Sequence, residues 1–410
     1  MKAAILARLN TLSLGTSGVH PSLIHLMKEL INRDITPLRG DHSHKIFLLQ
    51  GGGALGAYQA GVYAGLAESG EAPDWVAGVS IGGINAALIA GNVPERRVER
   101  LREFWERVSA NSPAMLPPMF DALRPMFNRA SAASALTLGI PGFFSPRFPP
   151  PALAPDGTPG ALSYYDTAPL KATLEQLVDF DLINQKRVRL SLGAVDVRTG
   201  DSVYFDNTKT RICPEHVMAS GALPPGFPPV EIDGALYWDG GIVSNTPLWY
   251  VLDEDPRMNA LIFQVDLFSA SARAPRNLSQ VQERQKDIQY SSKARFNLAR
   301  LRELEELRAS LHRLLGKLPK AALSDPDVQR LSAVSTRGPI TLVHFVNRHD
   351  TRSMDFKDYE FSRATMTDLW RGGHDDVRRA LADPDWNRAT EVANGMRVFD
   401  MTRGRSQDDQ

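Results

Sequence analysis

This chain of 410 residues contains very little cysteine and carries no formal net charge. Cys213 is the single cysteine, which excludes an internal disulfide and fits a reducing compartment. Because no histidine stands directly beside it, we interpret Cys213 as a packed apolar residue rather than a nucleophile. Lys and Arg together number 47, as do Asp and Glu. Nucleic-acid-binding proteins usually carry a basic surplus, so we expect no nucleic-acid partner.

Long apolar runs are also missing. No uninterrupted stretch of about 18 apolar residues occurs, so no transmembrane helix is predicted. Arg8 interrupts the apolar run at the amino terminus too early for a signal-peptide core. We therefore expect a cytoplasmic protein, with at most peripheral contact at the inner face of the membrane. No metal-ligand cluster stands out, and we expect neither a metal nor a cofactor.

The order of strand-like and helix-like segments predicts an α/β fold. Residues 45–50 and 75–79 have the composition of short buried strands, and each leads through a glycine-rich turn into a helix. Repetition of this unit predicts a mostly parallel central sheet with helices on both faces. The expected regions are a helical leader at 1–44, a main domain at 45–270, and a largely helical C-terminal extension at 271–410 that contributes one strand near 340–346.

The segment Gly78-Val79-Ser80-Ile81-Gly82 lies between a predicted strand and a predicted helix. This is the Gly-x-Ser-x-Gly arrangement of a nucleophile elbow, a tight turn that exposes the serine hydroxyl at the carboxyl end of a sheet. Gly78 and Gly82 supply the small residues that the turn needs, and the N–H of Ile81 points toward the same space. We predict that Ser80 is a nucleophile; an incidental serine in a glycine-rich turn is the alternative.

An earlier glycine patch, Gly51-Gly52-Gly53-Ala54-Leu55-Gly56, follows the first predicted strand. Consecutive glycines allow backbone N–H groups to converge on a developing negative charge, so Gly51, Gly52 and Gly53 are predicted to form an oxyanion hole. The patch also fits the dinucleotide fingerprint Gly-x-Gly-x-x-Gly. The serine elbow on the next strand favours the oxyanion hole. The dinucleotide alternative would use Gly51, Gly53 and Gly56 with Glu68, Glu71 or Asp74 as the ribose-binding acid.

A base for Ser80 is found among the carboxylates rather than the nine histidines. His216 falls in a predicted helix and His344 in a predicted strand, which indicates structural or solvated roles. Asp239 follows a strand and precedes Gly240-Gly241, which permit close approach to another loop. A carboxylate can act as a base if burial raises its pKa toward neutrality. The alternatives are a turn-capping role for Asp239 and a base at Asp196, which lacks the paired glycines.

With these patches and the segment 219–230, the chain resembles the patatin-like lipid acyl hydrolases over about residues 45–268. The resemblance implies a Ser-Asp dyad without histidine, with Ser80 as nucleophile, Asp239 as base and the oxyanion hole at Gly51, Gly52 and Gly53. It departs from the family at Leu55, where many members carry a cation that would help hold a phosphate. This weakens the case for phospholipids in particular and leaves neutral esters, other acyl esters and thioesters open.

We therefore expect a serine hydrolase that cleaves acyl esters of lipids. An acyltransferase or thioesterase using the same dyad remains open, as does a non-catalytic, lipid-responsive interaction protein with this fold. The proline-rich segment 112–160, with methionine and phenylalanine between the prolines, is expected to lack long regular elements. It is a candidate lid or acyl-binding wall, the alternative being an irregular connection packed on the core.

A long helical region at 273–317 carries eleven basic and five acidic residues, and its leucines recur at helical spacing. A basic amphipathic helix can lie on anionic lipid. The alternative is a leucine stripe that faces the core, with a charged back in solvent.

Overall fold

The computed structural model of the chain describes residues 44–109, 124–254, 259–272, 274–335, 338–348, 357–383, 386 and 396–402. The chain divides into two units, Met1–Arg39 and Gly40–Gln410. The predicted N-terminal leader falls outside the described residues except for its last position. No helix in the described ranges is both long enough and apolar enough to cross a membrane.

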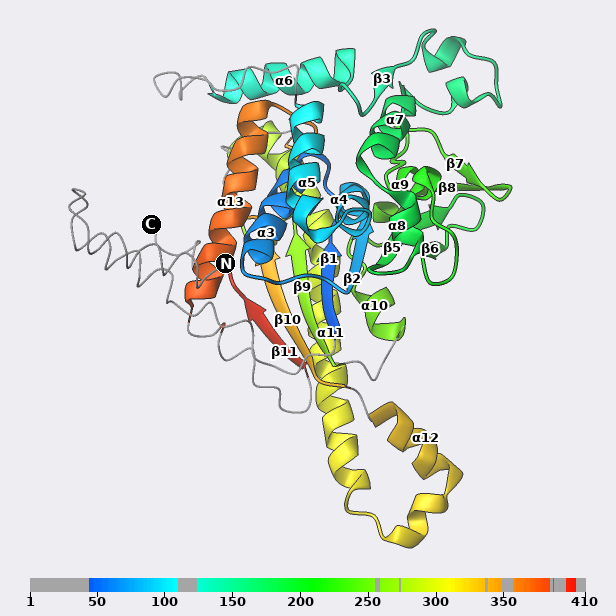
Figure 1. Cartoon of the computed structure of the whole chain (residues 1–410), viewed down its shortest axis with the longest axis vertical. Coiled ribbons are helices and arrows are strands. Elements are labelled where there is room, and N and C mark those ends of the chain that lie inside the picture. The colour runs from blue at the N-terminus through cyan, green and yellow to red at the C-terminus, as the bar shows by residue number, and fades with distance from the viewer. Residues whose placement is uncertain are drawn as a thin grey trace, which may run out of the picture. The chain divides into compact units, whose positions relative to one another are not determined.

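Nine of the strands in the described residues form one sheet (Figure 1). They are β1 (His44–Leu49), β2 (Trp75–Val79), β5 (Arg189–Asp196), β6 (Ser202–Asp206), β7 (Val230–Ile232), β8 (Ala235–Asp239), β9 (Ala260–Asp266), β10 (Ile340–Val346) and β11 (Met396–Asp400). The order is β11-β10-β9-β1-β2-β5-β8-β7, with β6 paired to β5. All pairs from β11 to β5 are parallel, whereas β6, β7 and β8 run antiparallel to their neighbours. Two further strands, β3 (Ser145–Pro146) and β4 (Tyr165–Asp166), pair separately.

Helices cover both faces of this sheet, which confirms the predicted fold class. The α-helices are α3 (Gly56–Glu68), α4 (Ile81–Ala90), α5 (Pro94–Val108), α6 (Arg124–Leu138), α7 (Ala168–Leu177), α8 (Phe180–Asn184), α9 (Pro214–Ser220), α10 (Leu248–Glu254), α11 (Leu278–Leu315), α12 (Pro326–Ser335) and α13 (Arg363–Ala382). Short 3-10 turns are η1 (Gly53–Leu55), η3 (Pro151–Leu153), η4 (Pro159–Ala161), η5 (Gly240–Ile242) and η6 (Lys320–Ser324).

The two faces of the sheet are built from alternate residues of the same strands. On one face Phe47 of β1 meets Tyr63 of α3, with ring centroids 5.8 Å apart. On the other face Ile46 packs in a core that includes Val251 of α10 and Leu301 of α11. Strands buried on both faces read as continuous apolar runs, which is why residues 46–49 carry no polar alternation.

The C-terminal region contributes two strands to the sheet rather than the expected one. β10 pairs with β9 in parallel, and β11 pairs with β10 in the same direction. The prediction missed β11 because it is a half-buried edge strand that mixes charged and apolar residues, so no apolar run marks it. The sheet thus continues from residues 45–270 into the C-terminal region without a break in pairing.

Part of the proline-rich segment is regular, contrary to expectation. Residues 124–138 form α6, whose one proline, Pro125, stands in the first turn. Proline is tolerated there because the first turn has no intrahelical acceptor for its missing N–H. The next proline is Pro141, after the helix has ended. Beyond α6 the chain forms only short elements, as predicted.

The C-terminal helix α13 packs directly on α3 through glycines. A Cβ atom on Gly61 of α3 would collide with the carbonyl oxygen of Trp370, and one on Gly373 of α13 would collide with that of Tyr58. The two backbones therefore approach too closely for any side chain at these positions. Tyr58 adds a hydrogen bond across the interface, 2.7 Å from its hydroxyl to the carboxylate of Asp376.

We predict that Gly61→Ala lowers the free energy of unfolding by about 1–3 kcal/mol, because the added methyl forces α13 away from α3. Urea unfolding followed by circular dichroism measures this. Gly316→Ala is the matched control, since Gly316 has helical φ and ψ of −64° and −13° and an added Cβ would meet only ordinary contacts. Equal stability of the two variants would contradict the close helix contact.

Candidate functional site

Ser80 lies on a sharp turn between β2 and α4, at the carboxyl edge of the sheet. Its φ of 57° and ψ of −128° are unusual for a residue with a side chain, and such strain is typical of functional turns. A Cβ on Gly78 would collide with the carbonyl of Gly82, and one on Gly82 with the carbonyl of Leu49. Both glycines are therefore required by the tightness of the turn.

Asp239 is the last residue of β8, and its side chain is hydrogen-bonded to the side chain of Ser80. Only 2% of Asp239 is exposed. Burial raises the pKa of Asp239 to about 6, although hydrogen bonds from the Ser80 hydroxyl and the Gly241 N–H act in the opposite direction. The Gly241 nitrogen lies 2.7 Å from Asp239 Oδ1. The carboxylate therefore titrates near neutrality, where it can accept a proton.

The segment Ser220–Ala222 holds the serine and the aspartate together. The Ser80 N–H donates to the carbonyl of Ser220 at 3.0 Å, and the Asp239 N–H donates to the carbonyl of Ala222 at 3.0 Å. The Ser220 hydroxyl in turn donates to the carbonyl of Gly193 in β5 at 2.7 Å. Two residues that are 159 positions apart in the sequence (239 − 80) are thus attached to one short loop.

The first glycine patch lies directly against Ser80. A Cβ on Gly51 would be 3.0 Å from the Cβ of Ser80. Among the described residues, no protein acceptor is recorded for the N–H groups of Gly52 and Gly53 or for that of Ile81. Gly51 differs from expectation, because its N–H already donates to the carbonyl of Asn245 at 3.2 Å. It is therefore excluded as an oxyanion donor.

Asn245 is a site residue that the sequence analysis missed. Its side-chain amide donates to the Gly51 carbonyl at 2.9 Å, so its main chain and side chain both hold this glycine. Asn245 follows Gly241 by four residues, and its side-chain oxygen also lies against Gly241. One buried asparagine therefore links the glycine patch to the Asp239 loop. The only available signal was its place shortly after the Asp-Gly-Gly motif.

The C-terminal region also reaches the glycine patch. The carbonyl of Asp358 accepts the N–H of Ala54 at 2.9 Å and occupies the space where a Cβ on Gly53 would lie. The Asp358 carboxylate binds Lys286 of α11 at 2.8 and 2.9 Å. An ion pair between α11 and the segment before α13 thus supports η1 from outside the sheet.

Two tyrosines from this region lie near the dyad. Tyr290 of α11 stacks on Phe268, with ring centroids 4.8 Å apart, and Phe268 lies against Gly52. Burial raises the pKa of Tyr290, with smaller contributions from the charges of Asp239 and Asp358. Burial and the same two charges help to raise the pKa of Tyr359 to about 12. Both phenols therefore remain protonated hydrogen-bond donors beside the site.

The other candidate residues have partners elsewhere. The carboxylate of Asp196 accepts the N–H groups of Arg198 and Thr199 and so closes its own turn. His344 Nε2 lies 2.7 Å from Asp266, which fits the predicted structural role. The sequence interpretation placed no histidine beside Cys213, yet His216 Nδ1 lies 3.0 Å from its sulfur. Burial and the neighbouring Glu215 nevertheless raise the pKa of the Cys213 thiol to about 11, which disfavours a thiolate nucleophile.

The dinucleotide alternative fails on the placement of its acids. Glu71 and Asp74 precede β2 and so lie at the amino-terminal edge of the sheet, whereas the glycine patch follows β1 at the carboxyl edge. Glu71 forms an ion pair with Lys45 at 2.7 Å, and Glu68 contacts His374 at 2.9 Å. None is free to bind a ribose next to the patch.

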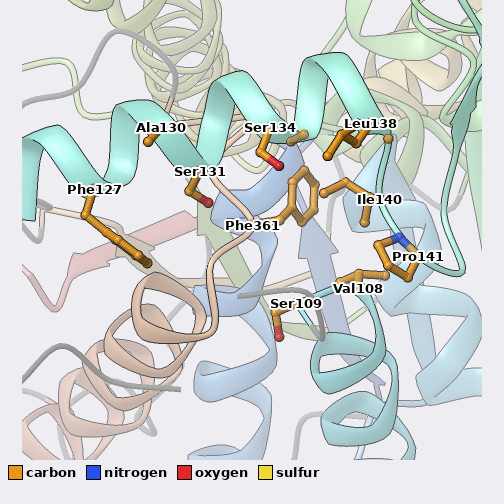
Figure 2. Close-up of a pocket in the computed structure, with 12 residues that line it drawn as sticks. Val108, Ser109, Phe127, Ala130, Ser131, Ser134, Leu138, Ile140, Pro141 and Phe361 are labelled. Atoms are coloured by element: carbon orange, nitrogen blue, oxygen red, sulfur yellow. The ribbon is translucent and has the colours of Figure 1, made fainter. Parts of the chain in front are cut away.

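A separate pocket of about 160 Å³, lined by apolar side chains and three serines, lies beneath α6. Figure 2 shows Phe361 and Ile140 below this helix, with Val108 and Pro141 nearby. Its lining residues include neither Ser80 nor Asp239. A cavity of this size admits only a small group, since an engineered cavity of about 150 Å³ holds benzene. Among the residues that the structure describes, no group of three or more potential ligands is placed to hold a metal.

Comparison with known proteins gives two family matches. The model described as "Patatin-like phospholipase" matches residues 47–252, and one described as "Patatin phospholipase" matches residues 288–392. One solved structure that is similar is VipD from Legionella pneumophila, at 14% identity and a TM-score of 0.35, covering 84% of this chain and 67% of VipD. A search of curated proteins found no match. Since the first match alone spans half of the sequence, the chain belongs to the patatin-like phospholipase family, whose members are lipid acyl hydrolases.

Proposed function

We propose that this protein is a serine hydrolase that cleaves acyl esters of lipids through Ser80 and Asp239. The observation that carries the proposal is the hydrogen bond between the Ser80 side chain and a buried carboxylate. A carboxylate in water is too weak a base to activate a serine, but one whose pKa is raised to about 6 is matched to work near neutral pH. Family membership supplies the substrate class.

In the proposed reaction Asp239 accepts the Ser80 proton while the Ser80 oxygen attacks the ester carbonyl. The oxyanion of the tetrahedral intermediate receives hydrogen bonds from the N–H groups of Gly52, Gly53 and Ile81. Asp239 then returns the proton to the leaving alcohol, and an acyl-enzyme remains on Ser80. Water, deprotonated by Asp239, attacks the acyl-enzyme and releases the acid. The proton passes back to Ser80, so the dyad is restored.

No histidine is needed for this sequence of steps. The described histidines with side-chain partners are engaged elsewhere: His216 with Cys213, His344 with Asp266 and His374 with Glu68. In the Ser-His-Asp arrangement an imidazole separates the serine from the carboxylate. Here the Asp239 carboxylate accepts a hydrogen bond from the Ser80 side chain without an imidazole between them, which supports a two-residue mechanism.

Leu55 limits the lipid head groups that the glycine patch can recognise. This side chain is buried, with 1% exposed, and carries no charge toward a phosphate. Lys286, a cation that approaches the patch through Asp358, is paired with that carboxylate. We therefore propose esters whose recognition does not depend on a phosphate bound at this loop. The lid role of 112–160 stays a prediction; residues 110–123 lie outside the described ranges.

The proposal is tested by Ser80→Ala and Asp239→Asn. Both variants should lose at least a thousandfold in kcat/KM on a chromogenic acyl ester, because each removes a group that acts in bond formation. Asp196→Asn is the matched control and should keep wild-type activity. Labelling with a fluorophosphonate probe should modify Ser80. Wild-type turnover by Ser80→Ala would contradict the mechanism, and a panel of esters and thioesters on the wild type would define the substrate.

The pH dependence follows from Asp239. Only the ionised carboxylate can accept a proton, so kcat/KM should fall about tenfold per pH unit below about pH 6. Because the folded-state pKa is raised, this group stabilises the fold below about pH 4 and loses that contribution as pH rises through about 6. At pH 8 the free energy of unfolding of Asp239→Asn should therefore exceed that of the wild type by up to about 3 kcal/mol. A flat activity profile between pH 5 and pH 7, where a base with a pKa of about 6 predicts a roughly tenfold rise in kcat/KM, would contradict the assignment.

Lys286 should affect the reaction without touching the substrate. Lys286→Met removes the ion pair that positions Asp358 against Ala54, and a partly exposed pair is worth about 1 kcal/mol. If that energy orders the oxyanion loop, kcat should fall about fivefold with little change in KM. Arg300→Met, which breaks an exposed pair with Glu303 on the same helix, is the control. Equal rates for the two variants would show that the ion pair does not order the loop.

A further inference from the structure

The far end of the α11–α12 hairpin exposes apolar side chains to solvent. We call residues 307–324 the hairpin tip. Within it Leu307, Leu314, Leu318 and Leu323 are 65%, 61%, 39% and 50% exposed. Single exposed leucines are ordinary, but four within one short segment are typical of a contact with a protein or a membrane.

The hairpin tip stands clear of the sheet. Leu301 of α11 is fully buried in the core with Ile46 and Ile340, which lie in the amino-terminal halves of β1 and β10. From Leu301 the helix continues for 14 residues to Leu315, which is about 21 Å at 1.5 Å per residue. Figure 1 shows α11 and α12 extending beyond the sheet as a hairpin. The leucine stripe predicted from the sequence is thus core-facing at Leu301 and solvent-facing in the tip.

The charge of the hairpin tip has one sign. It contains four basic residues and no acidic residue. Arg308 pairs with Glu305, and Arg313 contacts the hydroxyl of Ser310. Lys317 and Lys320 have no carboxylate partner among the described residues. Acidic residues flank the tip at Glu305, Glu306 and Asp325. Of these, Glu305 pairs with Arg308, and Asp325 accepts the N–H groups of Asp327 and Val328.

A surface that is both apolar and cationic fits an anionic lipid interface. Leucine side chains gain free energy on entering the acyl boundary, and each nearby Lys or Arg gains about 1 kcal/mol from anionic head groups. A second copy of this chain fits less well, because it would bring four more cations against the four already present. We propose that the hairpin tip, residues 307–324, docks the protein on the surface of an anionic membrane.

The position of the hairpin tip decides what this docking does. Ser80 lies at the carboxyl edge of the sheet, whereas the tip extends past the opposite edge. Docking therefore tethers the protein to lipid without placing the tip at the nucleophile. The proposal does not depend on the chemistry of Ser80, and hydrolysis of a water-soluble ester should be independent of the tip.

The test is co-sedimentation of the full chain with vesicles of equal parts phosphatidylcholine and phosphatidylserine, and with vesicles of phosphatidylcholine alone. We expect binding to the anionic vesicles, weakened by salt because surface charges are screened. Leu314→Ser/Leu318→Ser and, separately, Lys317→Glu/Lys320→Glu should each lower the binding at least tenfold. Lys186→Glu/Arg187→Glu reverses two exposed charges outside the tip and is the matched control.

Three results would overturn the docking proposal. They are equal vesicle binding by wild type and both tip variants, equal binding to neutral and anionic vesicles, and a lipid-independent dimer that the leucine substitutions dissociate. Hydrolysis of a water-soluble acyl ester by every tip variant at the wild-type rate shows that the variants are folded. If the wild type binds vesicles but hydrolyses no ester, the proposed function fails while the docking stands.

Discussion

The site is organised around one buried carboxylate. Asp239 is removed from water at the end of β8, where its side-chain partners among the described residues are the Ser80 hydroxyl and the Gly241 N–H. Two neutral donors offset part of the cost of desolvation and leave the pKa raised to about 6. Additional donors would lower the pKa and make the group a poorer base. The incomplete solvation of Asp239 is thus a stability cost that the proposed chemistry requires.

A rigid surrounding framework keeps Asp239 buried despite this cost in stability. The loop at Ser220–Ala222 accepts the backbone N–H groups of both Ser80 and Asp239, and Asn245 attaches the glycine patch to the Asp239 loop. Gln50, which is fully buried, accepts the N–H of Leu267 at 2.7 Å and so ties the end of β1 to the end of β9. Each loop is held by hydrogen bonds to another loop rather than by its own conformation, which keeps the strained turn at Ser80 in place.

The C-terminal region belongs to this framework. It supplies two strands to the sheet, packs α13 against α3, and supports η1 through Asp358 and Lys286. The long helix α11 therefore has two different environments. Its first half carries Lys286 and Tyr290 beside the glycine patch, while its last half leaves the core after Leu301 and exposes leucines and cations. One helix joins the site to the proposed lipid-binding tip.

Local pattern in the sequence was sufficient for the fold class, for the glycine-framed turns and for the long helix α11, since each depends on residues that are neighbours in the chain. It could not reveal that the N–H of Gly51 is consumed by Asn245, because that bond joins positions 194 apart. The sequence analysis missed β11 because an edge strand that is only half-buried mixes apolar with charged residues, so that no apolar run marks it. The raised pKa of Asp239 and the proximity of Ser80 were decided by the tertiary structure, since burial and long-range hydrogen bonds exist only once the sheet has formed.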